Sequence, residues 1–138
     1  MIKFYRTDHK VLSEITEYED NMWVCMTKPT VDETKLIAED FEIDLADVRA
    51  ALDDEESSRV EVEDGYTLIL VDIPSIEMRN EREAYTTIPL GIILVKDILI
   101  TVCAEDTPVL DAFIESKVKE FSTKKRMRFM YQICLLYT

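Results

Sequence analysis

The sequence contains few of the residues that most catalytic sites and phosphate-binding loops require. Its 138 residues include one histidine and two glycines. This leaves little room for a glycine-rich phosphate-binding loop, and histidine-dependent catalysis would need His9, which we expect at the surface in a polar segment. Positive charge is scarce, because 16 Lys and Arg face 29 Asp and Glu for a net charge of −13. A general nucleic-acid partner is not expected, since phosphate neutralisation requires a positive surface.

Cysteines and long apolar runs are scarce as well. The three cysteines, Cys25, Cys103 and Cys134, are far apart and form no Cys-x-x-Cys pair. This indicates reduced, structural thiols in an intracellular protein rather than a disulfide framework or a zinc site. A membrane-spanning helix needs about 20 apolar residues, whereas the longest uncharged runs are residues 85–95 and 129–138. The N-terminal segment has no apolar signal-peptide core, so we expect a soluble chain.

Apolar residues make up 47% of the chain, enough for a single domain over residues 1–138 with its own core. Runs rich in β-branched residues predict strands, and capping residues followed by helical spacing predict helices. The expected strands cover residues 2–6, 22–26, 59–63, 66–73, 84–95 and 98–104. The expected helices cover residues 30–40, 44–52, 107–121 and 123–138. This order favours an α/β (α+β) fold, with a mixed central β-sheet flanked by helices.

The side-chain pattern also predicts which faces are buried. Leu36 and Ile37 are expected inward on the first helix, and Val60 and Val62 inward on a half-buried strand. Pro74 is expected to end its strand, because proline lacks the N–H that a central ladder requires. A charged loop is expected over residues 78–83.

The last predicted helix, residues 123–138, has no stop signal, since neither glycine, proline nor a polar tail follows Leu136. We therefore expect the chain to be a fragment whose final helix continues in the full-length protein. The predicted inward face of this helix consists of Met127, Met130, Tyr131, Cys134 and Leu135.

Charge is unevenly distributed along the chain. Residues 1–64 hold 19 acids and 7 bases, whereas residues 117–128 are basic. The acidic half is open to three interpretations: a solvated face that keeps the protein soluble, a divalent-cation site, or a contact with a basic surface of another subunit. The basic segment is suited either to an anionic lipid surface or to the acidic region of a neighbour.

Several short motifs resemble the N-terminal cytosolic domain of the CorA-type magnesium transporters. In that family a Phe-x-Ile element, an Arg-Pro-Lys-Val-Glu strand entry, a strand starting with Tyr and a Thr-Val strand end occur in this order. The matching residues here are Phe41 and Ile43, Arg59 to Glu61, Tyr66, and Thr101 with Val102; Trp23 and the capping box at Thr30 also fit. The resemblance covers nearly the whole chain, and the Gly-Met-Asn pore signature of the family is not in it.

Two pairs of residues depart from the family pattern. Arg49 and Ala50 stand where the family has a Glu-Asp pair whose Asp is a regulatory metal ligand, and Ser57-Ser58 replaces an Arg-Pro pair. Nearby carboxylates offer the hard oxygen ligands that Mg²⁺ and other divalent cations prefer. The candidate ligands are Asp47, Asp53, Asp54, Glu55 and Glu56.

The resemblance implies a cytosolic regulatory domain of a divalent-cation transporter or channel, which senses Mg²⁺ and gates through contacts between subunits. The full-length protein would be a homopentamer at the cytoplasmic face of the cell membrane, reaching the membrane only through its C-terminal part. The alternative is a free-standing acidic interaction domain without a transport role. An enzyme is not expected, because no base or nucleophile can be placed beside Asp53 to Glu56. Asp72, inside an apolar strand, is a candidate for a carboxyl of perturbed pKa, although such a residue more often faces outward.

Overall fold

The computed structural model describes residues 1–53, 55–79 and 82–136, with the side chains of 76–79 and 82–85 outside that description. Seven strands form one sheet in the order β2-β1-β3-β7-β6-β5-β4. The strands are β1 (Ile2–Asp8), β2 (Val11–Ile15), β3 (Trp23–Thr27), β4 (Arg59–Val62), β5 (Tyr66–Arg79), β6 (Arg82–Val95) and β7 (Ile98–Cys103). The helices are α1 (Val31–Asp40), α2 (Leu45–Val48), the 3-10 helix η1 (Ala50–Leu52), α3 (Pro108–Ile114) and α4 (Arg126–Leu135).

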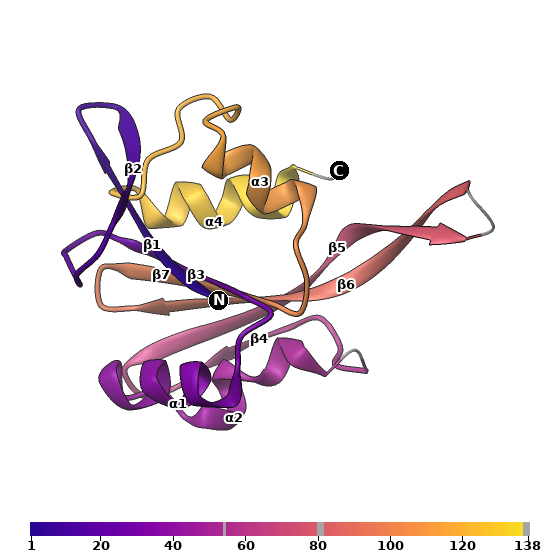
Figure 1. Cartoon of the computed structure of the whole chain (residues 1–138). Helices are drawn as coiled ribbons and strands as arrows, with labels where there is room; N and C mark the ends of the chain where they lie inside the picture. The colour runs from indigo at the N-terminus through magenta and orange to yellow at the C-terminus, as the bar shows by residue number, and fades with distance from the viewer. Residues whose placement is uncertain (54, 80–81, 137–138) are drawn as a thin grey trace.

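The sheet is mixed and is covered by helices on both faces, which confirms the expected fold class. Strands β3 and β7 pair in parallel, and the other neighbours pair antiparallel. Helices α1 and α2 lie on one face, and α3 and α4 lie on the other (Figure 1). No helix among the described residues is long and apolar enough to cross a bilayer.

Side chains that alternate between the two faces of the central strands form both layers of the core. On β3, Val24 and Met26 face the α1–α2 layer, whereas Trp23 and Cys25 face the α3–α4 layer. Successive side chains of a strand point to opposite faces, so a fully buried strand is apolar throughout. Trp23 is completely buried, and its indole N–H donates to the hydroxyl of Thr101 at 2.9 Å, which satisfies its one polar atom.

The predicted capping box of α1 is confirmed. The Glu33 N–H donates to the Thr30 hydroxyl at 3.1 Å, and the Glu33 carboxylate accepts from the Thr30 N–H at 2.8 Å. One inward assignment is wrong: Ile37 is fully buried, but Leu36 is 49% exposed. Adjacent helical positions are 100° apart, and only the Ile37 side faces the sheet.

Pro74 does not end its strand, contrary to the expectation. Strand β5 continues to Arg79, and Pro74 pairs with Thr87 of β6. Strand β4 reaches only as far as Leu70 of β5, so beyond that residue β5 has one neighbour and its other edge is open. A proline is tolerated at such an edge because no ladder hydrogen bond is lost there. The charged loop expected over residues 78–83 is wrong where the structure describes it, because Met78 pairs with Glu83 and Arg79 with Arg82. Residues 80–81 lie outside the described residues. The long β5–β6 hairpin projects from the sheet in Figure 1.

The two C-terminal helices are shorter than predicted. Helix α3 ends at Ile114, because Ser116 has a positive φ of 58° that breaks the helix, and α4 begins only at Arg126. The predicted inward face of α4 is wrong in part. Phe129 and Ile133 are its buried residues, and Met130 and Cys134 are partly buried. The remaining three, Met127, Tyr131 and Leu135, are exposed.

The edge strand β4 buries the opposite face from the one that the sequence predicted. Val60 and Val62 are 64% and 80% exposed, whereas Arg59 and Glu61 are half-buried. Glu61 pairs with Leu68 of β5, which belongs to the core cluster under α1 and α2. The polar side chains of β4 therefore face the α2 layer.

Candidate metal centre

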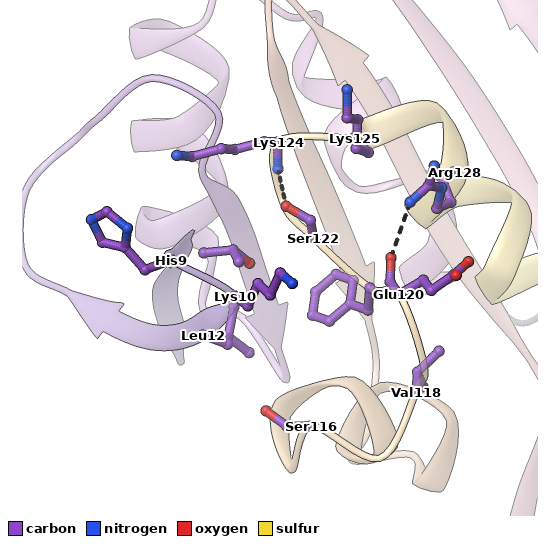
Figure 2. Close-up of a pocket in the computed structure, with 12 residues that line it drawn as sticks. His9, Lys10, Leu12, Ser116, Val118, Glu120, Ser122, Lys124, Lys125 and Arg128 are labelled. Carbon is purple, nitrogen blue, oxygen red and sulfur yellow. Dashed lines mark hydrogen bonds between the residues drawn. The ribbon is translucent and has the colours of Figure 1, made fainter.

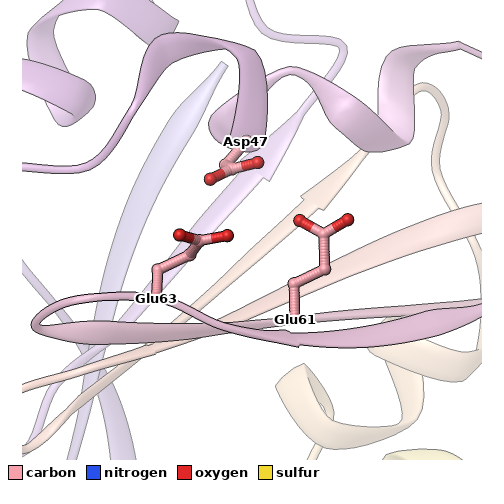
Figure 3. Close-up of side chains that lie close together, drawn as sticks. All are labelled: Asp47, Glu61 and Glu63. Carbon is pink, nitrogen blue, oxygen red and sulfur yellow. The ribbon is translucent and has the colours of Figure 1, made fainter.

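Three carboxylates meet between α2 and β4 (Figure 3). One oxygen from each of Asp47, Glu61 and Glu63 lies within 4.8 Å of the other two. Asp47 and Glu61 are half-buried and Glu63 is exposed. We call this group the carboxylate cluster; among the described residues it is the one set of acids, histidines and cysteines that converges in this way.

Local structure explains why these three side chains meet. Asp44 caps α2 by accepting from the Ala46 N–H at 3.0 Å, and this fixes the short helix that carries Asp47. Glu61 and Glu63 are two residues apart, so strand geometry points both to the same side. The Glu63 N–H donates to the Tyr66 carbonyl at 2.9 Å, closing the turn at Gly65, whose φ is +89°.

Tyr66 links the helix and the strand at this site. Its hydroxyl donates to Asp47 Oδ2 at 2.5 Å and accepts from the Asp44 N–H at 3.3 Å. Burial, followed by the hydrogen bond to Asp47, raises the pKa of Tyr66 to about 12. Tyr66 is therefore a permanent hydrogen-bond donor near neutral pH, and it orients the Asp47 carboxylate toward the two glutamates.

Arg59 supplies positive charge to the cluster. Its Nε contacts Glu61 Oε1 at 2.6 Å, and its guanidinium also contacts Glu56 Oε2 at 2.5 Å. These two hydrogen-bonded carboxylates raise the pKa of Arg59. One guanidinium shared between two acids cannot neutralise the three carboxylates of the cluster, so the site keeps a negative charge that a divalent cation would balance.

The donor set suits a hard divalent cation. A metal ion placed between two carboxylate oxygens at about 2.0–2.6 Å from each brings those oxygens to within about 5 Å or less, and the cluster already has this spacing. No histidine or cysteine takes part, so the donor chemistry is that of Mg²⁺ or Ca²⁺ rather than of a structural zinc site.

The other predicted ligands lie apart from this cluster. Asp53 accepts from the Glu55 N–H at 3.0 Å in a local turn, and Glu56 is engaged by Arg59. Asp54 lies outside the described residues. Of the four predicted ligands that the structure describes, only Asp47 is brought together with further acids.

The pair that replaces the family's Glu-Asp, Arg49 and Ala50, has a structural role here. The guanidinium of Arg49 donates to the hydroxyl of Thr34 at 3.0 Å, joining α2 to α1. Ala50 is buried against the sheet. Neither residue offers a metal ligand, so the carboxylate cluster is a different set of residues from the family's acidic pair.

The remaining candidates from the sequence are placed away from the site. Asp72 and His9 are exposed. Cys25 and Cys103 are buried, and desolvation raises the pKa of both thiols, that of Cys103 to about 11. Buried thiols of raised pKa are unreactive, which agrees with the structural role expected for them.

Glu61 and Glu63 were missed by sequence reasoning. The alternation Arg-Val-Glu-Val-Glu gives two possible inward faces, and the apolar one is the ordinary choice. No local signal separates the two faces, because the acids Glu61 and Glu63 and the apolar Val60 and Val62 alternate with the same period of two.

Comparisons with known proteins agree with the fold. The family model described as CorA-like Mg²⁺ transporter protein matches residues 18–136. The soluble domain of CorA from Methanocaldococcus jannaschii aligns with TM-score 0.69 and 21% identity over 91% of this chain and 50% of that chain. The complete CorA magnesium transporter of the same organism aligns with TM-score 0.65 and 19% identity over 88% and 40%.

A third similar structure is the ZntB cytoplasmic domain from Vibrio parahaemolyticus RIMD 2210633. It aligns with TM-score 0.64 and 16% identity over 84% of this chain and 48% of that chain. The chain thus spans half or less of the length of each of these solved structures. A comparison with curated proteins finds no match.

Proposed function

Because the chain belongs to the CorA-like Mg²⁺ transporter family, we propose that it is the cytosolic regulatory domain of a divalent-cation transporter. In this proposal the domain senses intracellular Mg²⁺ or a similar cation and controls opening through contacts between copies of itself, at the cytoplasmic face of the membrane. The family is one of transporters and not of enzymes.

The carboxylate cluster of Asp47, Glu61 and Glu63 is the observation that carries the sensing role. Three carboxylates within 4.8 Å repel one another, and a divalent cation turns this repulsion into attraction. Mg²⁺ keeps several waters and needs only one or two carboxylates from a protein. Its affinity for such a site is then modest, as a sensor of a millimolar cytosolic ion requires.

The carboxylate cluster lies at the edge of the sheet, and this position supports a role between subunits. Strand β4 is the last strand of the sheet, and Glu63 is exposed. A neighbouring copy that approaches this edge could add a ligand or a water-mediated contact to the same ion. Bound cation would then hold copies together, and its loss would loosen them; the partners are other copies in a homo-oligomer, a pentamer in the full-length protein.

Thermal unfolding with and without Mg²⁺ tests this proposal. A ligand that binds only the folded state stabilises it by about 2.7 kcal/mol when its free concentration is about 100 times its Kd. We expect the unfolding midpoint to rise with MgCl₂ but not with KCl of equal ionic strength, and to return with EDTA. Light scattering on the same samples reports whether Mg²⁺ also drives association.

Paired variants make the test specific to the cluster. The double variant Asp47→Asn with Glu61→Gln should lose the Mg²⁺ response, whereas Asp53→Asn with Glu55→Gln changes the net charge equally and should keep it. An equal response in both variants would show that Mg²⁺ only screens the overall charge of the protein. The transport role is tested separately by the coding sequence beyond Thr138, where two apolar segments of about 20 residues are expected.

A further inference from the structure

A hollow of about 710 Å³ lies between the β1–β2 hairpin and the loop that joins α3 to α4 (Figure 2). Four cationic side chains line it, together with His9 and a single acid, Glu120. The four cations are Lys10, Lys124, Lys125 and Arg128. We call this hollow the basic pocket; it is a local excess of positive charge in a chain with a net charge of −13.

Most of this positive charge is not neutralised within the chain. Among the described residues, Lys10 and Lys125 have no carboxylate partner. Arg128 donates only to the backbone carbonyl of Glu120, at 3.4 Å. Lys124 contacts Asp8 at 3.3 Å, but the same carboxylate already accepts from Arg6 at 2.6 Å.

The N-terminus of α4 adds to the excess. This ten-residue helix has no acid in its first turn, and its N-cap residue, Lys125, makes no side-chain capping bond. Arg128, which lines the basic pocket, stands in that first turn. Arg126 stands in the same turn but lines a different hollow, beside β4 and β5. Cations at the positive end of a helix dipole are unfavourable, and an anion bound there would relieve the repulsion.

The walls of the basic pocket are held in place. The Thr7 N–H donates to the Thr123 hydroxyl at 2.9 Å, and the Thr123 N–H donates back to the Thr7 hydroxyl at 3.1 Å; both bonds are buried. Phe121 contacts the buried rings of Phe129 and Trp23, with centroids 4.5 and 6.1 Å away. These contacts fix the backbone that carries the cationic side chains. The pocket is therefore already formed before a ligand binds.

We propose that the basic pocket binds an organic phosphate. Lys10, Lys125 and Arg128 hold the phosphate oxygens by charge-assisted hydrogen bonds, with Lys124 released in part from Asp8. The apolar body of the ligand lies against Leu12, Val118 and Phe121, which line the same hollow. This site is separate from the carboxylate cluster, lies in the other helical layer, and does not depend on the proposed cation sensing.

The phosphate could be free or could be the headgroup of a phospholipid, and the probes separate these sources. Calorimetric titration of the whole chain with ATP, at about 50 mM salt to limit screening and with EDTA to remove divalent cations, is expected to give a Kd below about 1 mM. Sedimentation with vesicles of phosphatidylglycerol, against vesicles of phosphatidylcholine, tests the headgroup. Either result supports the proposal and identifies the source.

Matched variants locate the binding. Lys10→Gln with Lys125→Gln should weaken the binding of ATP or of the anionic vesicles by at least about tenfold, because each lysine donates a charge-assisted bond. Lys28→Gln with Lys35→Gln removes the same charge elsewhere, on exposed residues, and should leave the Kd within about twofold.

Three results would overturn the proposal. One is the absence of binding to both ATP and anionic vesicles at low salt. Another is an equal loss of affinity in the two double variants, which would reduce the effect to overall charge. The third is self-association, without added phosphate, that is lost on changing Lys10 and Lys125; the basic pocket would then receive the acidic region of a second copy.

Discussion

At the scale of single residues, Tyr66 joins the fold to the candidate metal site. Its hydroxyl connects Asp47 and Asp44 of the α2 region to the start of β5. Hydrogen bonds that involve a charged group stabilise a protein by about 1.5–3 kcal/mol when buried and by less when half-exposed. Tyr66 therefore both stabilises the packing of α2 and orients one carboxylate of the cluster.

Replacing Tyr66 by Phe should lower the free energy of unfolding by about 1 kcal/mol. The folded-state pKa of Tyr66, about 12, is above its ordinary value of 10.0. Its contribution is therefore fully present below pH 10 and is lost as the pH rises toward 12. Urea unfolding at neutral pH and at pH 11 should show a smaller gap between the variant and the parent at pH 11. An unchanged gap would mean that Tyr66 ionises as freely when folded as when unfolded.

The candidate site could be predicted from the sequence only in part. Asp47 is identifiable because an acid follows the predicted cap Asp44 on a short helix. Glu61 and Glu63 are not, because the choice of inward face on β4 depends on what covers it. The α3–α4 layer leaves Val60 and Val62 exposed, and nothing local to the strand encodes that.

At the scale of elements, helix α1 is fixed by its capping box and by the chain terminus. The terminal amino group donates to the Glu33 carboxylate at 2.9 Å, in addition to the bonds between Glu33 and Thr30. These hydrogen bonds, that from the Thr30 backbone first, lower the pKa of Glu33. The capping box could be predicted from the four consecutive residues 30–33, because each of its hydrogen bonds joins residues within that segment.

Replacing Thr30 by Ala should cost about 1 kcal/mol of stability. The lowered pKa of Glu33 means that its own contribution is present above the unfolded-state pKa and is lost as the pH falls through the folded-state value. Thermal unfolding across pH 2–7 should therefore show a loss of stability at low pH in the parent and in Thr30→Ala alike, because the alanine variant keeps the backbone N–H that donates to Glu33. The cost of the substitution itself should change little with pH, since the lost hydroxyl accepts from a backbone N–H. Thr30→Ser keeps the hydroxyl and should behave like the parent; if it unfolds like the alanine variant, the cap contributes nothing.

Elements that depend on distant partners were predicted less well. Pro74 remains within β5 because β4 is short, and the end of α3 depends on a loop that returns to pair with Thr7. Thr7 and Thr123 are 116 positions apart, and no local pattern reports such a contact. Strand β2 was not expected because its burial pattern is mostly exposed, which leaves only a weak apolar alternation to detect.

At the scale of the whole molecule, the charge is separated between the two helical layers. The carboxylate cluster lies with α2 and the sheet edge at β4, and the basic pocket lies with the α3–α4 loop and the β1–β2 hairpin. A net charge of −13 opposes compaction and association. In the proposed function, divalent cations bound at the carboxylate cluster reduce this repulsion, and the ion acts on stability and assembly in this way.

Paramagnetic Mn²⁺ added in small amounts to the ¹⁵N-labelled protein tests the central claim most directly. Mn²⁺ takes the same oxygen ligands as Mg²⁺ and broadens the signals of nearby amides. We predict selective broadening of the amides around Asp47, Glu61 and Glu63, reversed by excess Mg²⁺. Broadening centred on residues 53–56, or spread evenly over the acidic surface, would contradict the account.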